Sequence, residues 1–322
     1  MTLSSTLICR IAFGRRYKDD EGVERRKFHS LFNEIQAMVV TPFVSDYIPF
    51  MGWIDRVKGL HARLNRIFKE LDEFLQEVID EHMNPNRDTN EEGEDIVHVL
   101  LQLKKQRSLS FDLTYDHIKA ILVFATADTT AATIVWAMTA LMKNPRVMKK
   151  VQEEVRNLGD QKNFLDEDDI KRCNYFKALM KEILRLYLPA PLLVPKETNE
   201  KCSIDGYEIP AKTIVYINAW AIHRDDKAWE SPDEFYPERF LESSIDFKGQ
   251  DFGFIPFGAG RRICPGMHMA LVALDLLLAN LLYSFDWELP KGVKMEDVDF
   301  EGLPGLAQHK KNPLYLVAKT KE

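Results

Sequence analysis

The chain has 322 residues, a net charge of −7 and a sequence pI near 5.7. This acidic balance, without a stripe of basic and aromatic residues, argues against a protein that binds nucleic acid. The eight histidines show no HExxH spacing or comparable metal-binding motif. The four cysteines have neither CxxC spacing nor the pattern of a disulfide framework, which indicates a reducing compartment. They are Cys9, Cys173, Cys202 and Cys264.

The amino-terminal stretch 1–10 is too short and too polar for a signal peptide or a transmembrane helix. The longer apolar stretches further along the chain are interrupted by polar residues, which is typical of core helices. From the sequence alone, we expect this chain to be soluble.

Helices dominate the predictions for the first half of the chain. Apolar residues at helical spacing predict a helix over 23–40, and a second over 53–83 with its apolar stripe on one face. A polar, acidic loop over 84–95 precedes a short helix over 95–105. The longest helical pattern covers 115–143, which corresponds to roughly 43 Å of helix.

Strands form a minor part of the second half. A helix is predicted over 146–158, and one or two helices over 167–188, which Pro189 and Pro191 stop. The dipeptide Asp205-Gly206 predicts a hairpin, the stretch 213–219 is rich in β-forming residues, and 267–283 predicts a long apolar helix. With no internal repeat and no linker that divides it, the chain is expected to be one mainly α domain.

One cysteine lies in an unusual segment, 257–266, with the sequence FGAGRRICPG. Its glycines let the backbone pass close to a flat, bulky group. The helix that follows and the neighbouring arginines are expected to stabilise a thiolate at Cys264. A haem-thiolate site needs a rigidly held cysteine, close backbone around its sulfur and a cation for the propionates. The segment supplies all three, whereas a buried cysteine in a glycine-rich turn would not require this combination.

A second motif, Ala125-Thr126-Ala127-Asp128-Thr129-Thr130, lies in the middle of the longest predicted helix. An acid and hydroxyls are unusual among small core residues. Threonine hydroxyls that bond backward to the preceding turn open a helix locally, which makes a groove for a diatomic ligand and a water. A helix kink or a helix-packing site is the simpler interpretation of this motif by itself.

A third motif pairs Glu182 with Arg185, three residues apart on one helix face. A surface salt bridge is the simple interpretation of an isolated pair. A buried pair needs further partners, and Arg239, in the sequence Pro-Glu-Arg-Phe at 237–240, supplies one.

Together the three motifs resemble the cytochrome P-450 family of haem-thiolate monooxygenases, in particular its plant microsomal branch. The similarity runs from the first residues to about Ala318, with the cysteine signature, Glu-x-x-Arg and Pro-Glu-Arg-Phe in the family's order. The resemblance implies a mainly α, prism-like fold with a small β region. It also implies that 1–322 is a single domain corresponding to the C-terminal two-thirds of the family pattern.

The resemblance implies a role for individual residues. Cys264 would be the axial ligand of the iron in haem b (iron protoporphyrin IX), with Arg262 at a propionate and Phe257 beside the thiolate. Asp128 and Thr129 would deliver protons to the bound dioxygen. The other cofactor-binding residues would be Gly258, Gly266 and Ala125, the last lying over the haem. The structural triad would be Glu182, Arg185 and Arg239. The substrate pocket would be lined by Ala190, Leu192, Leu193 and Val194, with Leu306 as a further residue.

The implied reaction inserts one oxygen atom of O2 into a small apolar organic substrate. NADPH would supply the electrons through NADPH–cytochrome P-450 reductase, and the basic loop around Arg261 would face that partner. The implied location is the cytoplasmic face of the endoplasmic reticulum membrane. The implied substrate is a specialised plant metabolite.

Two departures from the family pattern stand out. Thr126 occupies a position where the family usually has glycine, and its branched side chain is expected to narrow the oxygen groove. The family's membrane anchor, first helices and Trp-x-x-x-Arg motif have no counterpart, so we expect a partial sequence, a truncated gene model or a shortened isoform. Two alternatives remain open. One is an enzyme that rearranges hydroperoxides, against which Asp128 and Thr129 argue, and the other is a truncated haem-binding or inert remnant without turnover.

Overall fold

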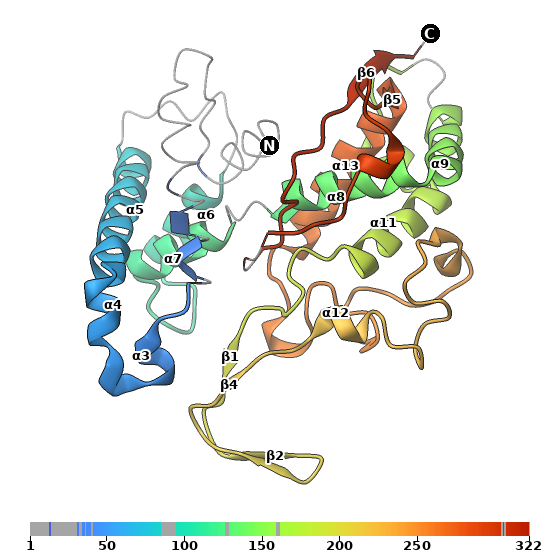
Figure 1. Ribbon diagram of the computed structural model, residues 1–322. Helices are drawn as coiled ribbons and strands as arrows, with labels where there is room; N and C mark the ends of the chain where they lie inside the picture. Colours follow the sequence, from blue (N-terminus) through green and yellow to red (C-terminus); the bar gives the residue numbers. More distant parts are fainter. Residues whose placement is uncertain are drawn as a thin grey trace. The chain divides into compact units, whose positions relative to one another are not determined.

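The computed structural model of the chain describes residues 13, 31, 34–35, 37–39, 41–84, 95–125, 129–158, 162–303, 305 and 307–321, with only the backbone of 124 and 125. Two compact units divide the chain, unit 1 over 1–128 and unit 2 over 129–322 (Figure 1). Each is described by itself. That both belong to one domain stays a prediction.

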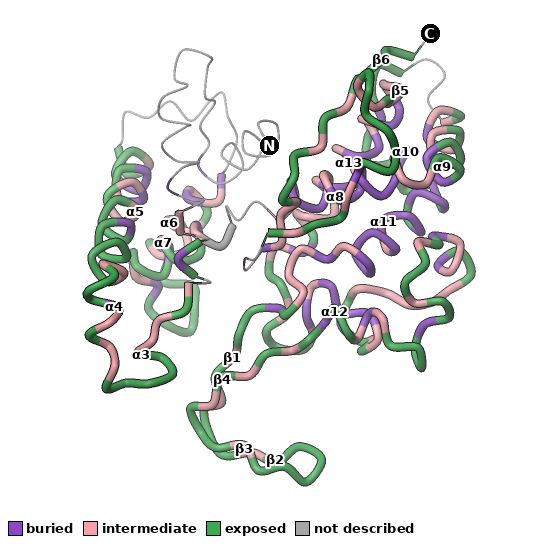
Figure 2. Tube along the Cα trace, viewed as in Figure 1, coloured by how far each residue is buried: buried purple, intermediate pink, exposed green. Residues whose placement is uncertain are grey.

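Unit 1 is helical. Its elements are α3 (Val44–Tyr47), the 3-10 helix η2 (Pro49–Met51), α4 (Trp53–Val57), α5 (Leu60–Met83), α6 (Ile96–Gln106) and α7 (Tyr115–Ala125). One apolar cluster joins α5, α6 and α7, and its fully buried members include Val78, Ile79, Val97, Ile118 and Leu122. The stripe predicted on α5 is buried at Ile67, Leu75, Val78 and Ile79, whereas its members Leu64 and Phe68 are exposed. Figure 2 shows exposed residues along α5.

The predicted helix over 53–83 is two helices, α4 and α5. Gly59 lies between them with φ +69°, in the left-handed region that glycine adopts most readily. The short helix predicted over 95–105 is confirmed as α6. It begins where the Asp95 side chain accepts a hydrogen bond from the backbone N–H of His98 over 2.7 Å. Of the helix predicted over 23–40, residues 31, 34–35 and 37–39 are described, and these are helical.

Unit 2 is built on five helices. They are α8 (Thr129–Lys143), α9 (Pro145–Asn157), α10 (Glu167–Ile170), α11 (Asn174–Leu186) and α13 (Met267–Ser284). Their apolar faces meet in one core, whose fully buried members include Leu141, Val151, Phe176, Leu179 and Leu282. The long helix α13 is long and apolar enough to cross a membrane, with a mean hydropathy of 1.5. Its buried residues from Leu274 to Tyr283 belong to this core, in agreement with the predicted core helix.

Two predicted helices have different bounds in the structure. The pattern over 115–143 corresponds to α7 and α8, and residues 126–128 between them lie outside the described residues. Of the one or two helices predicted over 167–188, the structure has two, α10 and α11. The Glu154 carboxylate accepts the backbone N–H groups of Tyr175 and Phe176, each over 2.8 Å, and so caps α11 at its own start.

The strands of unit 2 form three antiparallel pairs, each of two strands. They are β1 (Lys196–Glu197) with β4 (Ile214–Val215), β2 (Cys202–Ile204) with β3 (Tyr207–Ile209), and β5 (Phe285–Glu288) with β6 (Val317–Thr320). The predicted hairpin at Asp205-Gly206 is confirmed, since both residues have positive φ, 49° and 83°. Figure 1 shows that β2 and β3 project from one end of the unit.

Short helices and a long irregular segment complete unit 2. They are α12 (Ala219–Ile222), η3 (Pro237–Phe240), η4 (Gly260–Arg262) and η5 (Met295–Asp297). The predicted β-rich stretch 213–219 forms a strand only over Ile214–Val215, because the Asn218 side chain accepts the N–H of Ala221 and begins α12. We call residues 224–256 the meander, in which η3 is the single helical turn.

Candidate functional site

The segment 257–266, here called the cysteine loop, joins the meander to α13. The N–H of Gly258 donates to the carbonyl of Ile255 over 2.9 Å, and the N–H of Cys264 donates to the carbonyl of Phe257 over 2.9 Å. Gly258 has φ +75° and Gly260 has φ +69°, a conformation that a side chain would strain. Backbone hydrogen bonds therefore hold the cysteine loop in shape and place Cys264 just before α13.

Cys264 is exposed, whereas Cys173 is buried and Cys202 is half-buried. Burial raises the pKa of the Cys264 thiol, and a hydrogen bond from the backbone N–H of Gly266 lowers it. Arg261 and Arg262 are exposed, and a thiolate at Cys264 stays a prediction. A metal bound to the sulfur would remove the proton directly.

A glycine outside the cysteine loop lets the backbone of the meander approach the loop closely. Gly249, in the meander, has φ +78°, and a Cβ built there would lie 3.1 Å from the Cα of Ala259 and 3.2 Å from the carbonyl oxygen of Gly258. Only a residue without a side chain allows this approach of two backbones. The sequence offered no signal for it, because the contact joins segments that are irregular.

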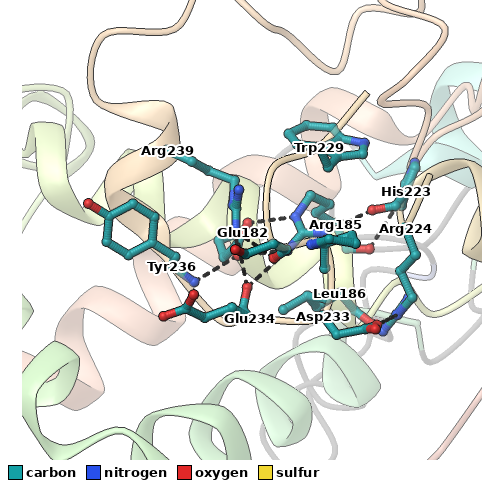
Figure 3. Close-up of polar contacts among 12 residues, drawn as sticks. Glu182, Arg185, Leu186, His223, Arg224, Trp229, Asp233, Glu234, Tyr236 and Arg239 are labelled. Carbon is teal, nitrogen blue, oxygen red and sulfur yellow. Dashed lines mark hydrogen bonds and ion pairs between the residues drawn. The ribbon is translucent and has the colours of Figure 1, made fainter. Parts of the chain in front are cut away.

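The predicted triad is assembled in the interior of unit 2 (Figure 3). Arg185 donates from Nε to Glu182 Oε2 over 2.8 Å and from Nη2 to Glu182 Oε1 over 2.9 Å, and neither side chain is exposed. The Nε of Arg239 lies 3.2 Å from the same Oε1. The backbone N–H of Tyr236 donates to this oxygen over 2.8 Å. The carboxylate of Glu182 is thus fully engaged, as a buried charge must be.

The two arginines also fix the meander. Arg185 Nη1 donates to the carbonyls of His223 and Pro232 over 2.8 and 2.6 Å. The remaining carbonyl acceptors are Glu230 and Ser231 for Arg239, and Glu234 for both arginines. The meander is irregular. Turns satisfy some of its carbonyls, and the guanidinium groups of these two arginines satisfy those of Glu230, Pro232 and Glu234.

His223, the residue that ends α12, was not predicted to belong to the site. Its ring is fully buried, with Nδ1 3.1 Å from the carbonyl oxygen of Arg185 and Nε2 2.9 Å from the backbone nitrogen of Ile255. Burial lowers the pKa of His223 to about 4, so the ring is neutral at physiological pH. A single histidine without a motif gives no signal in the sequence.

The oxygen-groove motif is described in part. Thr129 begins α8, and its carbonyl accepts the hydroxyl of Thr133 over 2.8 Å. That the hydroxyls of the motif's own threonines bond backward stays a prediction, since residues 126–128 lie outside the described residues. Asp128 and Thr126 lie outside the described residues, and Ala125 ends α7 with its backbone alone described. The catalytic roles of Asp128 and Thr129, and the place of Ala125 over a haem, stay predictions.

The predicted pocket residues 190–194 differ in their surroundings. Leu192 and Val194 are exposed by 46% and 50%, and so are available to a ligand. Leu193 is only 8% exposed, and its Cδ1 lies 3.8 Å from a Cβ built on Gly258. Leu193 therefore packs beneath the cysteine loop. Ala190 is half-buried, and Leu306 lies outside the described residues.

The residues of the cysteine loop fit a haem. The sulfur of Cys264 is accessible, and a Cβ on Gly266 would lie 4.0 Å from it, so this glycine keeps the space beside the sulfur open. Phe257 is held edge-on by Phe247, with ring centroids 6.1 Å apart. Arg262 is exposed and has no ion-pair partner within the described part of the chain, which leaves it for a propionate. A helical fold that presents one cysteine in this way defines a haem-thiolate protein.

Comparison with known proteins identifies the family. The family described as Cytochrome P450 matches residues 2–317, which is nearly the whole chain. The chain therefore belongs to the cytochrome P450 family.

Plant enzymes are among its relatives. The chain is 50% identical to a 5-OH-xanthotoxin synthase from Pastinaca sativa and 46% identical to a strychnine-11-hydroxylase from Strychnos nux-vomica. The alignments cover 98% and 99% of this chain and 63% of each relative. The chain thus spans about 63% of the length of these relatives.

Solved structures confirm the fold class. A zebrafish cytochrome P450 determined with progesterone superposes with a TM-score of 0.79 at 25% identity, covering 99% of this chain and 69% of that one. A zebrafish cytochrome P450 determined with abiraterone gives a TM-score of 0.78 at 23% identity, covering 98% of this chain and 70% of the other. The mainly α fold with a small β region is as predicted.

Proposed function

We propose that this chain carries the haem-binding part of a monooxygenase that inserts one oxygen atom of O2 into a small organic substrate. The observation that carries the proposal is the exposed Cys264 on a loop fixed by the bonds from Cys264 to Phe257 and from Gly258 to Ile255. The printed names of relatives, a synthase and a hydroxylase, support this activity.

Each residue of the proposed haem site would have a role of its own. Haem b, when bound, supplies the activation of O2 and the oxidation of the substrate. The sulfur of Cys264 would hold the iron, and the guanidinium of Arg262 would pair with a propionate. Phe257 would shield the sulfur, while Gly258 and Gly266 would let the backbone approach the ring. The hydroxyl of Thr129 and the carboxyl of Asp128 would hold and pass a proton.

The proposed substrates are small, ring-containing plant metabolites of mainly apolar character. Leu192 and Val194 offer exposed apolar side chains at the carboxyl end of α11, and apolar walls are typical of pockets for such ligands. The name of the 5-OH-xanthotoxin synthase indicates that this relative forms a hydroxylated aromatic product. We propose that NADPH supplies the electrons through NADPH–cytochrome P-450 reductase, at the cytoplasmic face of the endoplasmic reticulum.

The ligand assignment can be tested by spectroscopy. The chain is expressed with haem, reduced and exposed to carbon monoxide, and the Soret band is recorded for the wild type and for Cys264→Ser. We expect a thiolate-type band in the wild type and its loss in the variant. The matched control is Cys202→Ser, at a half-buried cysteine of strand β2, which should keep the band. A wild type without a thiolate-type band would contradict the proposed function.

Turnover is a separate measurement. The same haem-loaded chain is mixed with reductase, NADPH and a set of furanocoumarins, and hydroxylated products are sought by mass spectrometry. We expect product that depends on both NADPH and O2. Product formed from a hydroperoxide without O2 or reductase would favour the rearranging type of enzyme instead.

A further inference from the structure

His223 connects the two parts of the site that the sequence motifs define separately. Its backbone carbonyl accepts a hydrogen bond from Arg185 Nη1 over 2.8 Å, and its ring lies 3.1 Å from the backbone carbonyl of the same arginine. The ring also lies beside Phe254 in a tilted arrangement, with centroids 5.5 Å apart and planes at 43°. Figure 3 shows His223 beside Arg185 in the buried ion-pair network.

The hydrogen bonds of the ring allow one tautomer. The backbone nitrogen of Ile255 can only donate, so Nε2, 2.9 Å away, must accept. The proton is then on Nδ1, which donates to the carbonyl oxygen of Arg185. The imidazole is therefore neutral and uses both nitrogens, one toward α11 and one toward the meander.

A continuous path leads from this ring to the cysteine. The carbonyl of Ile255, the residue that donates to Nε2, accepts the N–H of Gly258 over 2.9 Å. The carbonyl of Phe257, next to Gly258, accepts the N–H of Cys264 over 2.9 Å. Four hydrogen bonds thus join α11 to Cys264, and His223 is the only side chain among them.

We propose that His223 is a positioning residue for Cys264, and that its acceptor nitrogen sets the place at which the cysteine loop offers the sulfur to the haem. The inference rests on the proposed haem-thiolate function. The aromatic neighbours of the cysteine loop pack against it whether or not this bond is present. The hydrogen bond from the N–H of Ile255 to His223 fixes the backbone that leads into the turns closed by Gly258 and Cys264. A side chain that fills the space but cannot accept this bond leaves a buried N–H unpaired.

Three substitutions of His223 test the hydrogen bonds of its two ring nitrogens separately. In His223→Gln the amide oxygen reaches the place of Nε2, so the bond from Ile255 is kept. In His223→Asn the shorter amide reaches only the place of Nδ1, so the bond to Arg185 is kept and that from Ile255 is lost. His223→Phe fills the volume without either bond. The matched control is Val151→Ala, at a fully buried residue of α9 outside this path.

The readout is the Soret band of the reduced, carbon-monoxide-bound chain, normalised to haem content. We expect the ratio of thiolate-type to neutral-thiol-type band to fall about fivefold or more in His223→Asn and His223→Phe. His223→Gln and Val151→Ala should stay close to the wild type. Loss of thermal stability in Val151→Ala with an unchanged ratio would show that destabilisation alone does not move the band. A wild-type ratio in both His223→Asn and His223→Phe would overturn the proposal.

Hydrogen exchange tests the same path without relying on the variants or on bound haem. In the wild-type chain, the amides of Ile255, Gly258 and Cys264 are expected to exchange as one unit, with similar protection. Much faster exchange at Ile255 than at the other two amides would show that the loop is held without His223, and would overturn the inference. If the wild type has no thiolate band but these amides are protected together, the proposed function fails while the link between His223 and the loop stands.

Discussion

Glu182 and Arg185 face each other through two parallel hydrogen bonds of 2.8 and 2.9 Å, and neither side chain has any surface in contact with water. Such a pair pays a large desolvation cost, which good geometry and additional partners offset. Here the additional partners are Arg239 and the backbone of the meander. The pair is therefore best understood as the anchor of an irregular segment, and its removal has consequences for that segment first.

Glu182→Gln should lower the free energy of unfolding by about 3–5 kcal/mol, because it leaves two guanidinium groups without their shared carboxylate in a buried place. Urea unfolding followed by tryptophan fluorescence measures the change. The control is Glu242→Gln, an exposed residue just after η3, which should change stability by less than about 0.5 kcal/mol. Equal effects of the two substitutions would show that the triad contributes no more than a surface charge.

Gly249→Ala should destabilise the chain more than Gly206→Ala, although both residues have φ near +80°. The left-handed conformation costs an alanine about 1 kcal/mol at either position. At Gly206 a Cβ meets nothing within 4 Å, whereas at Gly249 it would lie 3.1 Å from the backbone of Ala259. Thermal unfolding gives the difference, and haem content shows whether the cysteine loop is displaced. Similar losses in both variants would mean that the meander moves away freely.

Lowering the pH should destabilise the chain through His223. Burial, with smaller contributions from Arg185 and Arg224, lowers its pKa to about 4 from an ordinary value of 6.5. Between these values the unfolded chain binds the proton and the folded chain does not, so stability present above pH 6.5 is lost as the pH falls to 4. The loss amounts to about 3 kcal/mol. Urea unfolding at a series of pH values should show this slope in the wild type and a flatter one in His223→Gln.

The carboxyl of Asp275 should change the stability with pH in the opposite direction. This residue of α13 is half-buried, and burial raises the pKa of its carboxyl to about 6 from 3.8. The folded chain therefore holds a proton that the unfolded chain has released, and stability falls as the pH rises from 3.8 to 6. Asp275→Asn should raise the free energy of unfolding at pH 7.5 by up to about 3 kcal/mol. The exposed Asp226→Asn is the control. No gain at pH 7.5, or the same gain at pH 3.5, would contradict the assignment.

The sequence predicted the helices well where apolar periodicity is strong, as in α6, α9 and α13. It failed at boundaries set by single residues. The left-handed Gly59 divides one expected helix. Over 167–188 the sequence left one or two helices open, and the contact of the Glu154 carboxylate with the start of α11 decides for two. A periodic pattern contains neither a backbone conformation nor a contact from another helix.

The sequence predicted those residues of the site that belong to local motifs. Cys264 with its glycines, and Glu182 with Arg185, were found because their spacing has a physical meaning by itself. His223 acts through a contact far along the chain, since Ile255 is 32 positions away. Gly249 acts through a close backbone approach to Gly258 and Ala259, which belongs to no motif.

The dependence of the meander on side-chain donors has a kinetic consequence. Arg185 and the carbonyl of Glu234 are 49 residues apart. Their contact therefore closes a long loop, and it stabilises the chain only after α11 has formed. We therefore expect the core of α9, α11 and α13 to form first in refolding, and the cysteine loop to acquire its shape late. Arg239→Lys should then speed unfolding and leave the refolding rate nearly unchanged in stopped-flow experiments. Haem capture, in this order of events, is the last step of maturation and takes place on a chain whose helical core is already native.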